Sequence, residues 1–301
     1  MQPYKMYNDS SLRLLRAINS IFRAVLFPSR HEGPGFMRYA SFLVCLTPCL
    51  LATVPAFAVT DEIQVYTGEI MPVGEVGLTW HNNYALDGLK TPDFPGGLVD
   101  NHAYSSVTEW ALGVTPWFEA GVYLPLFSHT SNQGWTYNGF KLRALFVQPD
   151  NQDKDFYYGV NFEFSWNEKT WDTQVNTGEI RPIIGWRFGE DRRWSFTVNP
   201  ILDNNYKGFS RLEFVPATRL DYKIDETWTV AAEEYDDFGD LRGFLPGSQQ
   251  SHQLWGVVDY TGNPISVEAG IGFGLTSATD KLAVKVMLIS DLTGPHGLFA
   301  P

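Results

Sequence analysis

The side chains in this sequence that could do chemistry are charged residues set two positions apart. Lys141 and Arg143 form one such pair, and Glu179 and Arg181 form another. A spacing of two places both members on the same face of a β-strand. A face with both signs of charge can line a polar pore and contact a solute, or can tie neighbouring strands together through ion pairs. The chemistry that this pattern indicates is therefore noncovalent.

We predict that these side chains line the lumen of a barrel. The candidate lining residues are Glu119, Lys141, Arg143, Glu163, Glu179, Arg181, Arg187, Arg211, Glu213, Arg219, Glu268 and Lys285. With Glu109, Asp221, Glu233 and Asp259 added, the strands offer seven basic and nine acidic positions, so neither sign dominates. Two interpretations stay open: a narrow polar pore that contacts solute, or a lumen closed by opposite-sign cross-strand pairs among Glu119, Lys141 or Arg143, Glu163, and Glu179 or Arg181.

Histidines provide the only other catalytic candidates. His81, His129 and His252 could serve an outer-membrane lipid hydrolase if a serine from another strand met one of them. Ser251 and His252 are adjacent, so on a strand they face opposite ways and cannot simply pair. Hydrolysis of lipid is kept as an alternative function.

Metal and cofactor chemistry have little support in the sequence. The acidic residues of one stretch, Glu233, Glu234, Asp236, Asp237 and Asp240, lack the spacing of a calcium loop. No phosphate-binding glycine loop and no cluster of histidine and cysteine ligands occurs. We expect no cofactor, no metal site and no catalytic residue.

The elements that must position the charged residues are strands with a strict period of two. In residues 176–188, one face carries Ile180, Ile184 and Trp186, and the other carries Glu179 and Arg181. The predicted strands are 75–86, 104–114, 117–129, 136–148, 155–166, 176–189, 192–202, 209–222, 227–237, 251–261, 264–275 and 280–292. Each is long enough for the roughly 9–11 residues that a tilted transmembrane strand needs. Prolines at 125, 182, 200 and 216 make the bounds of their strands the least secure.

Short and long connections alternate between these strands. Thr115-Pro116 and Gly262-Asn263 are short, whereas 87–103 and 238–250 are long. Outer-membrane barrels combine short periplasmic turns, longer extracellular loops and an even number of strands. A soluble sandwich or lipocalin-like barrel would show the same alternation with the apolar face inside. Strand length and tryptophans near strand ends favour an all-β transmembrane antiparallel β-barrel of about twelve strands.

An export signal precedes the barrel. Met37 and Arg38 are followed by an apolar stretch that ends at Ala56-Phe57-Ala58, which is typical of a cleaved signal peptide over 37–58. Residues 1–36 are either an extended n-region or the product of a start codon assigned upstream of Met37. The predicted mature barrel is 59–301, in the outer membrane of a Gram-negative cell.

Cleavage changes both the thiol content and the charge of the chain. Cys45 and Cys49 lie inside the signal, so the mature chain has no cysteine for catalysis, metal binding or disulfides. Removing the six basic and two acidic residues of 1–58 takes the net charge from −12 to −16. Such a chain is a poor partner for nucleic acid.

Several motifs resemble those of a known group of proteins. The stretches 178–188 (GEIRPIIGWRF), 233–239 (EEYDDFG) and 251–254 (SHQL) resemble uncharacterised proteobacterial outer-membrane barrels. The turn over 113–121 (GVTPWFEAG) is similar to the strand-turn-strand unit of barrels associated with phenol-degradation operons and named as transporters. The resemblance covers most of residues 62–292 and implies a barrel in the envelope. The sequence departs from many such barrels at its end, where Ala300 and Pro301 follow Phe299.

From these observations we predict a passive channel, or porin-like transporter, for small solutes. Its expected partners are outer-membrane lipid, the solutes, and the barrel-assembly machinery during biogenesis. A sealed structural barrel is the first alternative, and a lipid-modifying hydrolase is the second.

Overall fold

The computed structural model describes residues 62–208 and 211–293, all of which belong to one compact unit. The predicted signal peptide and residues 1–36 lie outside these residues. The strands are β1 (Val76–Asp87), β2 (Tyr104–Thr115), β3 (Phe118–Thr130), β4 (Gly134–Val147), β5 (Phe156–Asn167), β6 (Asn176–Phe188), β7 (Trp194–Asn199), β8 (Leu202–Asn204), β9 (Leu212–Phe214), β10 (Ala217–Lys223), β11 (Trp228–Asp237), β12 (Ser251–Tyr260), β13 (Ser266–Gly274) and β14 (Leu282–Asp291).

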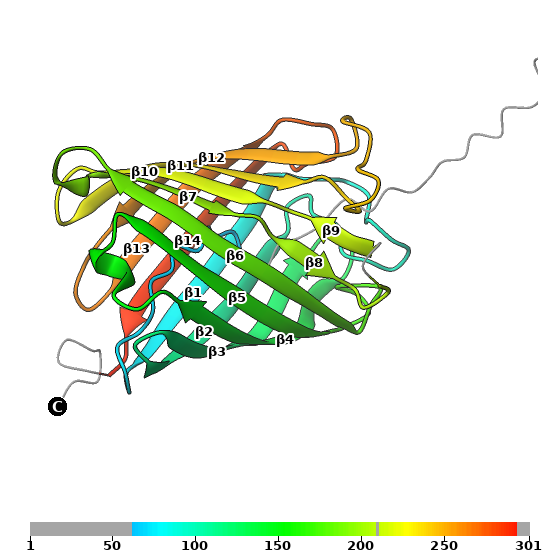
Figure 1. The fold of residues 1–301 in the computed structure, drawn as a ribbon. Coiled ribbons are helices and arrows are strands. Elements are labelled where there is room, and N and C mark those ends of the chain that lie inside the picture. The colour runs from blue at the N-terminus through cyan, green and yellow to red at the C-terminus, as the bar shows by residue number, and fades with distance from the viewer. Residues whose placement is uncertain (1–61, 209–210, 294–301) are drawn as a thin grey trace, which may run out of the picture. The chain divides into compact units, whose positions relative to one another are not determined.

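The strands close into an antiparallel barrel, visible in Figure 1. Apart from β7 with β8 and β9 with β10, each strand pairs with its sequence neighbours, and β1 pairs with β14 to complete the ring. Because β7 and β8 both pair with β6, they form one interrupted strand, and β9 with β10 forms another. The barrel therefore has the predicted twelve strands. No helix in the two described ranges is long and apolar enough to cross a membrane.

Both interruptions fall at prolines. Pro200 lies between β7 and β8, and Pro216 lies between β9 and β10. Proline has no N–H to donate, so the hydrogen-bonded ladder cannot continue through it. Pro182 remains inside β6, where it stands opposite Val160 of β5. Two of the four prolines that made the strand bounds uncertain, Pro200 and Pro216, are thus the positions where the wall is broken on two neighbouring strands.

The two faces of the wall differ as the alternation predicted. The outer face exposes large apolar residues, including Leu142, Phe162 and Val258, whereas the inner face buries Arg143, Glu163 and Lys285. A soluble barrel would have the opposite arrangement, with apolar residues inside. Contiguous apolar surface of this extent fits contact with lipid. This difference decides between the soluble and the transmembrane interpretations of the sequence.

Aromatic residues collect at both ends of the strands on the outer face. At the end with short turns, Trp117 and Phe118 stack on Phe146. At the other end, Trp135 contacts Phe127 and Tyr104. Bands of this kind mark the two membrane–water interfaces of outer-membrane barrels.

The connections follow the predicted alternation with one difference. Short turns and the 3-10 turns η1 (Asn151–Asp153) and η2 (Glu190–Arg192) lie at the end assigned to the periplasm, and the long connections 88–103 and 238–250 lie at the opposite end. The connection after β3 contains only residues 131–133, because β4 begins at Gly134 and not at residue 136.

Candidate functional site

A segment that precedes the first strand lies inside the barrel. Residues 62–72 form no strand, yet the side chains at the start of the segment are nearly inaccessible: Glu62 is 6% exposed, Val65 3% and Tyr66 5%. The segment is named here the lumen segment. Gly68 within it adopts a left-handed conformation with φ of 76°, and its carbonyl accepts a hydrogen bond of 2.6 Å from the Asn151 amide of η1.

The lumen segment is attached to strands on different sides of the ring. The Asn199 amide of β7 pairs with both backbone groups of Tyr66, accepting from its N–H at 2.7 Å and donating to its carbonyl at 3.0 Å. Arg181 of β6 donates to the carbonyl of Gln64 at 3.1 Å, and Lys285 of β14 donates to the carbonyl of Ile63 at 2.9 Å. Because β14 is distant in the closed ring from the neighbouring strands β6 and β7, the segment crosses the lumen.

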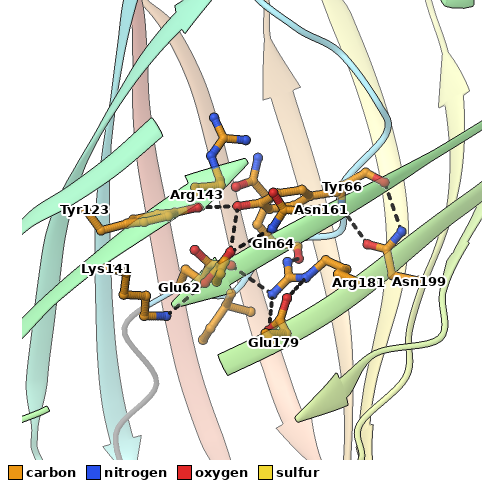
Figure 2. A network of polar contacts seen from close by, with 12 residues as sticks. Glu62, Gln64, Tyr66, Tyr123, Lys141, Arg143, Asn161, Glu179, Arg181 and Asn199 are labelled. Carbon is orange, nitrogen blue, oxygen red and sulfur yellow. Dashed lines mark hydrogen bonds and ion pairs between the residues drawn. The ribbon is translucent and has the colours of Figure 1, made fainter. Parts of the chain in front are cut away.

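A first polar network surrounds Tyr66 (Figure 2). The Tyr66 hydroxyl contacts the hydroxyl of Tyr123 and lies 3.4 Å from Glu163. The guanidinium of Arg181 stands over the Tyr66 ring, with its central carbon 4.3 Å from the ring centroid. Arg181 also pairs with Glu62 of the lumen segment at 2.9 Å and with Glu179 at 2.6 Å. The segment is therefore held by charge-assisted contacts to the side chains of the wall, which are about twice as strong as neutral hydrogen bonds.

The same network continues over the neighbouring strands. Arg143 pairs with Glu119 and, at 2.8 Å, with Glu109, whose other oxygen lies 3.1 Å from the His81 ring. Lys141 pairs with Glu163 at 3.4 Å. The pairs of Arg143 with Glu119 and of Lys141 with Glu163 are among the opposite-sign contacts that the sequence predicted across the wall.

A second network lies on the other side of the lumen. Arg219 pairs with Glu233, Asp259 and Glu268 and, at 3.5 Å, with Asp221 of its own strand, so one guanidinium meets four carboxylates. Lys285 bridges two of these carboxylates, with Nζ 2.6 Å from each of Glu233 and Glu268. Lys285 is only 1% exposed. Its contact with Ile63 joins this second network to the lumen segment.

The twelve predicted lining residues fall into two sets. Ten of them belong to the inner wall and its networks or cavity: Glu119, Lys141, Arg143, Glu163, Glu179, Arg181, Glu213, Arg219, Glu268 and Lys285. Arg187 lies at the periplasmic end, where it donates to the carbonyls of Asn151 and Lys154. Arg211 lies at the extracellular end in an exposed pair with Asp240.

The structure sets the register between β5 and β6, which the sequence left open. The sequence analysis placed either Glu179 or Arg181 beside Glu163. In the structure Glu163 stands directly opposite Glu179, and Arg181 stands opposite Asn161. The alternation of the sequence fixes which face a residue occupies but leaves the sliding of one strand along another by two residues undetermined.

A cavity of about 420 Å³ opens on the extracellular side of the lumen segment. Glu62 and Gln64 of the segment contribute to the lining of the cavity. The extracellular ends of β5 and β6, the short strands β8 and β9, and the loop residues Phe94 and Trp171 also contribute. This cavity is named here the vestibule. Little in the sequence points to the vestibule, because its lining depends on the register of the strands and on the lumen segment.

The histidine and acidic-loop candidates are occupied by other contacts. His252 lies 2.5 Å from Asp236 and 3.1 Å from the amide oxygen of Gln250, and the His129 ring contacts Trp135 at a tilt of 59°. In the acidic stretch, Glu233 points into the second network and Asp240 pairs with Arg211. Within the described ranges no group of three acidic, histidine or cysteine side chains is placed to hold a metal ion.

The lumen segment is the functional feature that the sequence analysis missed. Its residues Ile63 and Val65 alternate with polar neighbours, but the pattern covers too few residues for a transmembrane strand. The sign of it in the sequence was the stretch between the predicted cleavage site after Ala58 and the first predicted strand at residue 75, to which no element was assigned.

Comparison with known proteins gives similarity at the level of the fold. No family model and no curated protein sequence matches the chain. The COG4313 outer membrane channel from Pseudomonas putida F1 superposes with a TM-score of 0.52 and 11% identity, over 76% of this chain and all of that one. LpxR from Salmonella typhimurium has a TM-score of 0.40 and 7% identity over 71% of this chain and 99% of that one. A TodX monoaromatic hydrocarbon channel has a TM-score of 0.36 and 10% identity over 73% of this chain and 90% of that one. Both are too dissimilar to support an argument. The chain therefore has the fold of outer-membrane β-barrels.

Proposed function

We propose that this protein is an outer-membrane channel for small solutes whose lumen segment restricts passage. The observation that carries the proposal is the way the segment is attached. It crosses a charged lumen, and the contacts that hold it to β6, β7 and β14 are made by the side chains Arg181, Asn199 and Lys285. Side-chain contacts can be exchanged for water one at a time, whereas a segment built into the wall could move only by opening the barrel.

The fold-level comparison supports the same proposal. The Pseudomonas putida protein is described as an outer membrane channel, and we carry that description to this chain as part of the proposal. Twelve strands lie between small barrels filled by side chains and wide porins, so a lumen of this size can hold both a segment and a water path. Passage would be diffusion past charged walls, without a covalent step.

Conductance in a planar bilayer tests the proposal. Refolded residues 59–301 would be compared with a variant carrying Tyr66→Gly and Asn199→Ala, which removes the ring stacked on Arg181 and both backbone contacts of the segment. We expect short, infrequent openings in the parent chain and frequent, longer openings in the variant. A control with the same two kinds of substitution outside the lumen, Tyr158→Gly and Asn101→Ala, should behave like the parent.

The sealed structural barrel predicts a different result. If both the parent and the released variant stay silent while folding normally, the charge networks serve only to stabilise the wall. Lipid hydrolysis would then be assayed next, with substitutions at His81, His129 and His252.

A further inference from the structure

The vestibule has a row of acidic residues on its wall. Glu163 of β5 stands directly opposite Glu179 of β6, Glu179 opposite Asp203 of β8, and Asp203 opposite Glu213 of β9. All four residues line the cavity. Like charges placed directly opposite each other destabilise a sheet. The row therefore costs stability, and a positive ligand in the cavity would relieve that cost.

Basic side chains compensate only part of this row. Lys141 pairs with Glu163, and Arg181 pairs with Glu179. In the described part of the chain, no ion pair is found for Asp203 or Glu213. Among the residues that the structure describes, ten carboxyl side chains and three basic side chains line the vestibule. The half of the row on β8 and β9 thus lacks a positive partner from the wall.

The floor of the vestibule provides a second, independent observation. Glu62 belongs to the lumen segment and not to the wall, and it is 6% exposed. One of its oxygens, Oε1, pairs with Arg181, but the other, Oε2, has no hydrogen-bond partner among the described residues. A buried carboxylate oxygen is costly without a donor. Because Glu62 lines the vestibule, a ligand with N–H groups would supply the missing hydrogen-bond donor.

Apolar and aromatic side chains also line the vestibule, among neutral polar ones. Phe94 and Trp171 come from the extracellular loops, Ile201 and Val215 from the two strand breaks, and Tyr235 from β11. Aromatic rings attract organic cations through their faces, and apolar surface favours the body of such a molecule. The acidic side chains are spread over several strands and do not converge on one point as metal ligands would; no group of three in the described ranges is placed to hold a metal ion.

We propose that the vestibule binds organic cations, specifically protonated amines carried on an aromatic or alkyl body. The amine would lie against Asp203 and Glu213, with the free oxygen of Glu62 adding negative charge at the floor, and the apolar body would lie against Trp171 and its neighbours. This inference rests on the proposed channel function, because it names the class of solute that the vestibule would collect before passage. A cavity of about 420 Å³ is large enough for a single-ring amine.

Equilibrium binding in detergent tests the inference without any need for conductance. Benzylamine, which is protonated at pH 7.5, would be titrated into refolded residues 59–301 by calorimetry, with benzoate as the probe of opposite charge on the same ring. We expect benzylamine to bind and benzoate to bind at least tenfold more weakly. Asp203→Asn with Glu213→Gln should weaken benzylamine binding about tenfold, since two nearby charges are removed.

Matched variants keep the result interpretable. Glu190→Gln removes a charge from the exposed periplasmic turn η2 and should leave affinity unchanged. Trp171→Ala removes an aromatic side chain of a loop from the vestibule lining. It should weaken benzylamine binding without strengthening benzoate binding. Equal binding of the two probes, or unchanged benzylamine affinity in both vestibule variants, would overturn the inference. Binding that persists in a barrel that never conducts would refute the channel and leave the cation site standing.

Discussion

Replacing Lys285 with methionine is expected to destabilise the barrel more than any exposed charge substitution. The ammonium lies 2.6 Å from Glu233, 2.6 Å from Glu268 and 2.9 Å from the carbonyl of Ile63, and the side chain is 1% exposed. Removing one partner of a buried ion pair typically costs about 3–5 kcal/mol, because the other charge stays buried without compensation. Arg219 and the Tyr235 hydroxyl still contact Glu233, so we expect the lower end, about 3 kcal/mol.

Urea unfolding of the refolded barrel in detergent, followed by tryptophan fluorescence, measures this loss. Lys223→Met is the matched control: Lys223 pairs at 2.9 Å with the exposed Glu226 on a periplasmic turn, and its loss should cost less than about 1 kcal/mol. Adding Glu268→Gln to Lys285→Met should recover part of the stability, since it neutralises one of the stranded carboxylates. A loss from Lys285→Met no larger than that from the control would refute the claim that buried ion pairs hold the lumen together.

Three further predictions concern the lumen segment, the periplasmic mouth and an extracellular loop. Asn199→Ala leaves both backbone groups of Tyr66 unpaired and should weaken attachment of the lumen segment by about 1–3 kcal/mol. Amide hydrogens of the segment should then exchange faster, while those of the strands keep their protection. Arg187→Glu reverses a charge at the periplasmic mouth and should move the reversal potential of the open channel towards greater cation preference; an unchanged potential would exclude Arg187 from the ion path. Burial, together with the neighbouring Asp87 carboxylate, raises the pKa of Asp280 to about 6. The protonated Asp280 side chain therefore stabilises the fold. This contribution is complete below the pKa that Asp280 has in the unfolded chain and is lost as pH rises through about 6. After correction for intrinsic rates, the Leu89 amide that donates to Asp280 should be better protected at pH 5 than at pH 7.5, and Asp280→Asn should remove that difference.

The sequence predicted the strands well because a membrane barrel imposes a simple rule at every position. Each strand must present apolar residues to lipid and polar residues to the lumen, so alternation reports both its existence and its facing. The uncertain bounds around residues 200 and 216 coincide with the breaks between β7 and β8 and between β9 and β10. Chemistry local to proline was therefore visible in the sequence.

The contents of the lumen could not be predicted in the same way. The row from Glu163 to Glu213 depends on the stagger between strands, and a shift of two residues would have preserved every facing while changing every partner. The lumen segment depends on contacts between residues more than 100 positions apart, such as Tyr66 with Asn199. Neither feature leaves a periodic signal, so the candidate site was predicted as a list of residues without its geometry.

A reversible lock on the lumen segment tests the central claim most directly. Val65 packs in one buried cluster with Ala217 of β10, and residues 59–301 contain no cysteine, so Val65→Cys with Ala217→Cys would introduce the only thiols. Single-channel conductance would be recorded after oxidation and again after reduction, with each single variant as a control. If the segment restricts passage, openings should disappear on oxidation and return on reduction. Equal conductance in the locked and released states would contradict the account.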